Sequence, residues 1–406
     1  MNIKSITIAA ALVIPFTSGA QVKKIKSPDI KFTPVVENPV TPVKNQFRSG
    51  TCWCFSGISF LESEAIRING IKDTTAYPDF SEMFVISHSY QDRADKYVRL
   101  DGKLNFGAGS EGDDVLDVMR DYGLVPQSAQ PVLDYGQGDK ILPNHSELDD
   151  LAQSYVKVIA SNPGKKVSTV WKKGFQGIMD AYLGPCPESF EVNGKTMTPQ
   201  QYRDSYKLNA DDYVVLSSFT HHPFYTKFQI EVCDNWRWNS VYNVPMEELR
   251  EVVYNGLKNG YTTLWGADVS EVGFTRDGYA FLVDPKAKDK KSAGSDQEHW
   301  VGKAEEKAAK EDASNEAPAE LVPTQEVRQK WFDNKETTDD HGMHIYGIAK
   351  DETGKEYFVV KNSWGDTGKF HGIWYVSMNF FDGKTMDCII HKDALPKDLK
   401  KKLGIK

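Results

Sequence analysis

The stretch that most constrains this chain runs from Gln46 to Ser56. Its glutamine stands six residues before a cysteine, and the turn-forming sequence Ser-Gly-Thr separates the two. Apolar residues then recur at helical spacing, at Phe55, Ile58, Leu61, Ala65 and Ile68. The pattern predicts an amphipathic helix that begins at Cys52 and ends near Asn69–Gly70. Because the N-terminus of a helix favours a thiolate over a thiol, Cys52 is a candidate nucleophile.

A second cysteine, Cys54, offers an alternative interpretation of the same stretch. Residues two apart face different sides of a helix, so Cys52 and Cys54 do not share a face. A Cys-x-Cys metal or redox site needs further cysteine or histidine ligands at a suitable spacing, and the sequence does not supply them. We therefore interpret Cys54 as a small packing residue and expect neither a metal nor a cofactor. The backbone N–H of Cys52 and the side-chain amide of Gln46 are candidate donors to an oxyanion.

A nucleophilic cysteine needs a base, and the chain has nine histidines. A hairpin turn at Asp351–Gly354 brings the strands on either side of it together. Counting back from that turn places His344 within one residue of Asn362. An asparagine beside a histidine can orient one ring nitrogen and leave the other to accept the thiol proton, and Trp364 can shield that bond from water. The sequence thus predicts His344 as the base, Asn362 as its orienter and Trp364 as a supporting residue.

The N-terminus has the pattern of a secretory signal peptide. Lys4 is followed by an apolar run from Ile6 to Phe16 and by small residues at Ser18–Ala20. The apolar run is shorter than the ~20 residues that span a bilayer, so stable membrane insertion is not expected. We expect cleavage after residue 20 and export to the periplasm or the extracellular space.

Charge and cysteine content narrow the functional classes further. The chain has 49 lysines and arginines against 57 acidic residues, a net charge of -8, and a nucleic-acid partner is not expected without a basic face. Its five cysteines are too few for a disulfide scaffold. Two disulfides and a free Cys52 would fit this odd number, but the sequence does not indicate which cysteines pair.

Helical patterns dominate the first part of the chain and strand patterns the second, so the expected class is α+β. Residues 284 to 322 are rich in Lys, Glu, Ala, Asp and Ser, which is typical of a solvated insertion. The expected organisation is a signal peptide (1–20), an N-terminal arm (21–44), a mainly helical half with the nucleophile helix (45–212), a β-rich half with the catalytic histidine and asparagine (213–283 and 341–395), a charged insertion and connector (284–340) and a C-terminal tail (396–406).

Three blocks of this sequence resemble the signature blocks of papain-like cysteine peptidases: Gln46–Ser56, Met343–His344 and Lys361–Gly365. Finer features are similar to the bleomycin hydrolase/aminopeptidase C branch. They are Asn45–Gln46 with Ser49–Trp53, Phe80–Glu82, the Gly-rich loop before Tyr122–Pro126, and Val244–Pro245 with the helix that leads to Trp265–Val269.

The resemblance implies a papain-like two-lobed fold, with a helical half, an antiparallel β-barrel-like half and the active-site cleft between them. It also implies cofactor-independent, thiol-dependent hydrolysis of peptides or proteins, an aminopeptidase activity and a homo-oligomer, which in the branch is a hexamer. The last residues, Leu395–Lys406, lack the Pro-Trp-Asp-Pro-Met-Gly pattern of the branch's C-terminal arm. A papain-like endopeptidase therefore stays an alternative, as does a non-catalytic papain-fold module that binds peptides.

Overall fold

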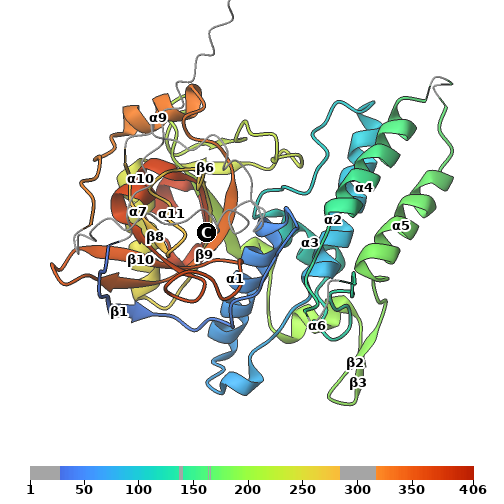
Figure 1. The fold of residues 1–406 in the computed structure, drawn as a ribbon, viewed down its shortest axis with the longest axis horizontal. Coiled ribbons are helices and arrows are strands. Elements are labelled where there is room, and N and C mark those ends of the chain that lie inside the picture. The colour runs from blue at the N-terminus through green and yellow to red at the C-terminus, as the bar shows by residue number, and fades with distance from the viewer. Residues whose placement is uncertain (1–27, 137–139, 163, 165, 284–316) are drawn as a thin grey trace, which may run out of the picture.

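The computed structural model describes residues 28–136, 140–162, 164, 166–283 and 317–406. The predicted signal peptide and residues 284–316 of the charged insertion lie outside this described part. Figure 1 shows helices α2, α3, α4 and α5 grouped on one side, a β-rich half on the other, and α1 between them. The chain is thus divided into a helical and a β-rich half, as the predicted α+β class requires.

The helices and strands have the following bounds. The helices are α1 (Cys52–Asn69), α2 (Glu82–Arg99), α3 (Asp114–Tyr122), α4 (Ser146–Ala160), α5 (Val170–Leu183), α6 (Pro199–Ser205), α7 (Met246–Lys258), α9 (Gln325–Asp333), α10 (Met378–Lys384) and α11 (Lys397–Leu403). The strands are β1 (Thr33–Glu37), β2 (Phe190–Val192), β3 (Lys195–Met197), β4 (Tyr213–Ser217), β5 (Lys227–Phe228), β6 (Val241–Asn243), β7 (Thr263–Ala267), β8 (Tyr279–Ala280), β9 (His341–Lys350), β10 (Glu356–Lys361), β11 (Ile373–Ser377) and β12 (Thr385–His391).

Helix α1 begins and ends at the predicted residues. Gly70 caps it in the left-handed conformation with φ 62°, which costs a glycine no steric strain. The expected amphipathic pattern, however, does not mean that one face meets solvent. Every residue from Cys52 to Ile66 is buried, polar ones included. The polar side of α1 packs against protein, and its side chains need partners there.

The large sheet runs in the order β5-β6-β4-β12-β7-β9-β10-β11-β8, and β1 pairs with β9 in addition. Most neighbouring strands are antiparallel; β4 with β6 and β11 with β8 are the parallel pairs. The predicted hairpin is present, because β9 pairs antiparallel with β10 and Lys350 faces Glu356. Because β1 lies within the predicted N-terminal arm and pairs with β9, part of this arm is a strand of the sheet.

Two hydrophobic cores flank α1. One joins α1 to the helical half, and it reaches the sheet through Leu264 of β7 and Ile389 of β12. The other fills the β-rich half and includes Trp265 and Leu399, so α11 packs onto this core. Because α1 belongs to the first core and contacts β9 of the sheet, its N-terminus lies where the two halves meet.

One segment with the composition of a strand is mostly irregular. The sequence Phe228–Val232 has the composition of a strand, but only Lys227–Phe228 pairs, with β6. The residues after it leave the sheet and run toward the helical half (Figure 1). No helix in the described part of the chain is long and apolar enough to cross a membrane.

Candidate active site

Cys52 is the first residue of α1, and its side chain is 6% exposed. The first turn of the helix contains no acidic residue that would offset the positive end of the helix dipole. Two backbone bonds join the segment before this turn to the segment after β10. Gln46 N–H donates to the Ser363 carbonyl at 2.7 Å, and Gly365 N–H donates to the Lys44 carbonyl at 3.0 Å. These bonds bring the Cys52 and Asn362 segments together.

The Gln46 side chain is fully buried between the same two segments. Its Nε2 donates to the Ser49 carbonyl at 2.7 Å, and its Oε1 accepts a hydrogen bond from Ser363 Oγ at 2.5 Å. The amide is therefore held at both of its atoms, in the turn that leads into α1. These two bonds fix the position of the amide that the sequence predicts as an oxyanion donor.

His341, the first residue of β9, is the histidine that contacts Asn362. Its Nε2 lies 2.8 Å from Asn362 Oδ1. The backbone N–H of Ser363 donates to the same Oδ1 at 2.7 Å, so the oxygen of this amide, rather than its nitrogen, faces the imidazole. Nε2 of His341 must then be the protonated nitrogen. Within the described residues, Nδ1 of His341 has no hydrogen-bond partner, and this leaves it as the proton acceptor.

The surroundings of His341 bring it close to the start of α1. A Cβ at the next residue, Gly342, would come within 2.8 Å of Ser56 Oγ and 3.3 Å of the Trp53 backbone nitrogen. Only a glycine allows β9 to approach the first turn of the helix this closely. The Trp364 ring lies over the imidazole, with 4.8 Å between centroids, as expected for a residue that shields it from water.

The predicted contact between His344 and Asn362 is wrong. His344 pairs with Lys361 in the sheet, so the predicted register is confirmed, but its Nδ1 is 2.8 Å from Ser59 Oγ on α1. Burial, and then the Lys361 ammonium, lower the pKa of His344 well below its usual range. His344 is thus a neutral, buried partner of α1, and the structure does not bring it to Asn362.

Alternation along the strand explains this correction. His341 and His344 are three residues apart in β9, and successive side chains of a strand point to opposite faces. A histidine followed by glycine was the sequence signal for the position where the strand meets the helix, because a close backbone approach requires the small residue.

Burial also controls the protonation of His341. Removal from water lowers its pKa to about 4, and the hydrogen bond from its ring to Asn362 acts in the opposite direction. The imidazole is therefore neutral at physiological pH. Any imidazolium that forms during a reaction is stabilised by the Asn362 oxygen.

The remaining cysteines are accounted for by packing or exposure. Cys54 is fully buried in the core, and its thiol donates to the Glu82 carbonyl at 3.6 Å, as predicted for a packing residue. No disulfide joins any of the five cysteines, so the two disulfides that the odd number allowed are not formed. One group in the described part of the chain has ligand atoms close enough together for a metal: His221, His222 and Glu231. Cys52 and Cys54 do not belong to it.

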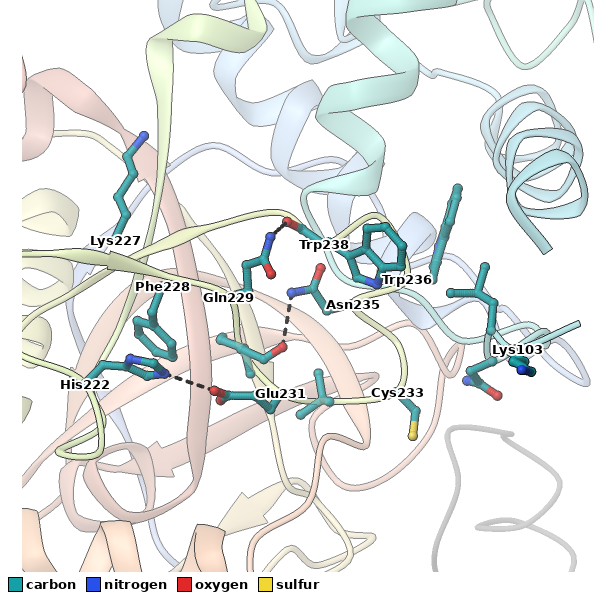
Figure 2. A pocket seen from close by; sticks show the side chains of 14 residues that line it. Lys103, His222, Lys227, Phe228, Gln229, Glu231, Cys233, Asn235, Trp236 and Trp238 are labelled. Atoms are coloured by element: carbon teal, nitrogen blue, oxygen red, sulfur yellow. Dashed lines mark hydrogen bonds and ion pairs between the residues drawn. The ribbon is translucent and has the colours of Figure 1, made fainter. Parts of the chain in front are cut away.

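A groove of about 530 Å³ lies between the loop at 103–105 of the helical half and the segment 227–238 of the β-rich half. Figure 2 shows Trp236, Trp238 and Phe228 among its lining side chains, with the His222–Glu231 pair at one end. The bond from the Trp53 indole to the Ala108 carbonyl, at 2.9 Å, ties the 101–112 loop to the first turn of α1. This loop thus connects the groove with the nucleophile helix.

Comparison with known proteins adds to this geometry. The profile of the Peptidase C1-like family matches residues 187–290 and 322–405. Aminopeptidase C of Lactobacillus delbrueckii subsp. lactis is 24% identical in an alignment 410 residues long that covers 92% of this chain and 84% of the relative. The mitochondrial cysteine proteinase 1 of Saccharomyces cerevisiae (strain YJM789) is 23% identical in an alignment 411 residues long that covers 91% of this chain and 79% of the relative. The crystal structure of PepW from Lactobacillus rhamnosis HN001 superposes with a TM-score of 0.66 at 18% identity, covering 92% of this chain and 84% of that one.

The chain belongs to the Peptidase C1-like family. Within the family, its relatives at about 23% identity over about 90% of the chain lie in the aminopeptidase C/bleomycin hydrolase branch. The predicted α+β, papain-like fold is confirmed by the superposition on PepW. Residues 291–321 fall between the two matched segments and coincide with most of the predicted charged insertion. Membership of a peptidase family implies peptide substrates.

Proposed function

We propose that this family member is an active cysteine peptidase in which Cys52 is the nucleophile and His341 the general base. The observation that carries the proposal is the His341–Asn362 pair. The hydrogen bond of this pair requires a proton on Nε2 of His341. Nδ1 then has no partner in the described part of the chain, and it lies next to the start of α1. His344, which the sequence indicated, does not have this arrangement.

The proposed reaction follows from these positions. His341 Nδ1 accepts the Cys52 thiol proton while Sγ attacks the carbonyl carbon of the substrate. The Cys52 N–H and the Gln46 amide stabilise the resulting oxyanion. The C–N bond breaks as His341 returns the proton to the leaving amine, which gives a thioester. A water molecule, deprotonated by His341, then hydrolyses the thioester and regenerates the thiol.

The test combines substitution with labelling. Cys52→Ala should abolish peptide hydrolysis, and a thiol-reactive epoxide should label Cys52 in the unsubstituted protein at one equivalent per chain. Cys186→Ser, which removes a half-buried thiol elsewhere, is the matched control and should retain activity. Full activity of a folded Cys52→Ala protein would contradict the proposal. An absence of Cys52 labelling would favour the non-catalytic peptide-binding module.

We further propose that the enzyme acts as an aminopeptidase. The similarity to relatives supports this proposal, because proteins named aminopeptidase C and aminopeptidase G align with most of the chain. The alternative is a papain-like endopeptidase. It is favoured by residues 395–406, which lack the sequence pattern of the branch's C-terminal arm. Hydrolysis rates of paired peptides with a free and an acetylated N-terminus separate the two. Equal cleavage of both members would reject an enzyme restricted to N-terminal residues.

Two proposals concern the whole protein. The pattern at residues 1–20 supports export to the periplasm or extracellular space, and N-terminal sequencing of the mature protein should then find Gln21 as its first residue. The branch supports a homo-hexamer, which sedimentation velocity would distinguish from a monomer. A cytoplasmic protein that retains Met1, or a sedimentation coefficient of a monomer, would contradict the respective proposal.

A further inference from the structure

Three carboxyl groups from distant parts of the chain meet beside the candidate site: Glu111, Asp339 and Asp387, here called the acidic cluster. Asp339 stands two residues before His341. Its carboxyl group interacts with that of Glu111 in the loop before α3. Asp387 lies on β12 and increases the electrostatic repulsion felt by both of the others.

The sheet and the loop explain why the cluster lies close to His341. Asp387 faces Gly266 on β7, and Gly266 in turn faces Gly342 on β9, so one row of residues leads from Asp387 to the residue after His341. The Glu111 loop is held against these strands, because a Cβ at Gly112 would touch Leu264 of β7 at 2.8 Å. The same loop is bonded to Trp53, as described above.

The acidic cluster has no cation among the described residues. Neither lysine nor arginine forms an ion pair with any of its three members within that part of the chain. Glu111 is 9% exposed, and its Oε1 has no hydrogen-bond partner there. Burial, followed by the neighbouring carboxylates, raises the pKa of Glu111 and of Asp339 well above their usual range. An unpaired buried carboxylate is unfavourable, so the arrangement is suited to a cation that arrives with a ligand.

The spacing argues against a metal ion as that cation. A metal draws three or more ligand atoms into one small shell, and in the described residues only His221, His222 and Glu231 approach each other that closely. The acidic cluster is more open than this. Wider spacing suits an ammonium or guanidinium group, whose several N–H donors point to separate carboxylates.

We propose that the acidic cluster binds a positively charged nitrogen of the peptide substrate, either the free α-ammonium or a lysine or arginine side chain near the scissile bond. The inference rests on the proposed peptidase function and adds a substrate class to it. Asp339 is the least buried of the three, so the cation meets it first, while Glu111 and Asp387 lie deeper and add negative charge. Asp234, between groove residues Cys233 and Asn235, also adds negative charge to Glu111 and Asp339.

The experiment measures kcat/KM for two pairs of fluorogenic amides with one leaving group. The first pair is an aminoacyl amide and its N-acetyl form, which isolates the α-ammonium. The second pair is N-acetyl-Arg-Leu and N-acetyl-Leu-Leu amides, which isolates a cationic side chain. The unsubstituted enzyme should prefer the charged member of at least one pair by tenfold or more. Either preference supports the proposal and identifies the source of the cation.

Isosteric substitutions then assign the preference to the cluster. Glu111→Gln and Asp387→Asn should each reduce it about 10- to 100-fold, mainly through KM, and leave N-acetyl-Leu-Leu amide hydrolysis within about threefold. Glu352→Gln, at the exposed β9–β10 turn, is the matched control and should change neither rate. Circular dichroism verifies folding, and calorimetric binding of the same peptides to a Cys52→Ala protein gives a second readout.

The outcomes separate this inference from the proposed function. Cys52-dependent hydrolysis without a preference for charge, or a preference unchanged by both substitutions, would overturn the acidic cluster while leaving the peptidase intact. The absence of any Cys52-dependent hydrolysis would instead reject the proposed function. Calorimetric binding that favours the cationic peptides would still support the cluster in that case, and equal binding of all four peptides would overturn it.

Discussion

Two groups of buried charged side chains lie beside α1, and they differ in whether their charges are matched by opposite charges. In one group, Lys44 pairs with Glu82 at 2.7 Å and with Glu62 at 3.5 Å, while Lys361 Nζ donates to Thr41 Oγ1 at 2.9 Å. We call Thr41, Lys44, Glu62, Glu82 and Lys361 the balanced cluster. In the acidic cluster, by contrast, carboxylates face one another without a cation in the described part of the chain.

The difference separates structural from functional charge. Burial alone would lower the pKa of Lys44, but Glu82 and then Glu62 raise it, so the Lys44 ammonium is matched by carboxylates within the balanced cluster. His344 lies beside this cluster through its Ser59 bond and its neighbour Lys361, whereas Gly342, the residue after His341, ends the row that leads to Asp387 of the acidic cluster. A site that binds a charged ligand has to leave its own charge unmatched, at a cost in stability.

The largest expected effect distinguishes the two histidines. His341→Gln should lower kcat/KM by about 10² to 10⁴-fold, because the general base is lost. His344→Gln should leave kcat within a few-fold and act on stability instead, since its role is to pair with Ser59. Steady-state kinetics and urea unfolding of both variants measure this. The reverse pattern, with activity lost only in His344→Gln, would restore the original assignment and break the comparison.

The next effect tests the balanced cluster. Lys44→Met leaves two buried glutamates without their shared cation and should lower the free energy of unfolding by about 3 kcal/mol. The control is Lys350→Met, which removes a cation from an exposed pair with Glu356 and should change the same quantity by less than about 0.5 kcal/mol. Equal urea midpoints for the two variants would show that the balanced cluster contributes no more than a surface ion pair.

The acidic cluster should respond with the opposite sign. Burial raises the pKa of Asp387 to about 7 in the folded protein, so its ionisation disfavours folding as pH rises from about 4 to 7. Asp387→Asn removes that penalty and should stabilise the protein by roughly 2 to 4 kcal/mol at pH 8 and by almost nothing at pH 4. Thermal unfolding across this range gives the measurement. A variant less stable than the parent protein at pH 8 would show that Asp387 has a compensating partner.

The smallest effect concerns the orientation of His341. Asn362→Ala should reduce kcat about 10- to 100-fold, because the imidazole loses the partner that sets its tautomer. The Asn362 bond acts to raise the pKa of His341, which must be neutral to act as the base, so loss of the bond should move the acidic limb of the pH–rate profile to lower pH. An unchanged limb would mean that Asn362 is structural only. Ser363→Ala, which removes a hydroxyl bound to Gln46 but keeps the Asn362 bond, is a control that should leave the limb in place.

Local patterns in the sequence predicted much of this architecture. The start of α1 at Cys52, its glycine cap, the α+β class and the β9–β10 hairpin all follow from spacing and turn chemistry, which act over a few residues. The segment 228–232 has a composition that suits a strand, but only its first residue finds an edge to pair with. The predicted positions of Gln46, Asn362 and Trp364 were close to those observed, since each borders a strand or turn that the pattern located.

Only the tertiary structure decided which histidine meets Asn362. Both histidines lie on one strand, and the choice depends on which face of that strand packs on α1 and on how closely Gly342 allows it to approach. The acidic cluster is likewise a product of packing, because residues 111, 339 and 387 belong to a loop, a strand entrance and a strand of a sheet that has to assemble first. Periodicity in sequence specifies elements and faces, but electrostatic environment arises from long-range neighbours, which no local pattern contains.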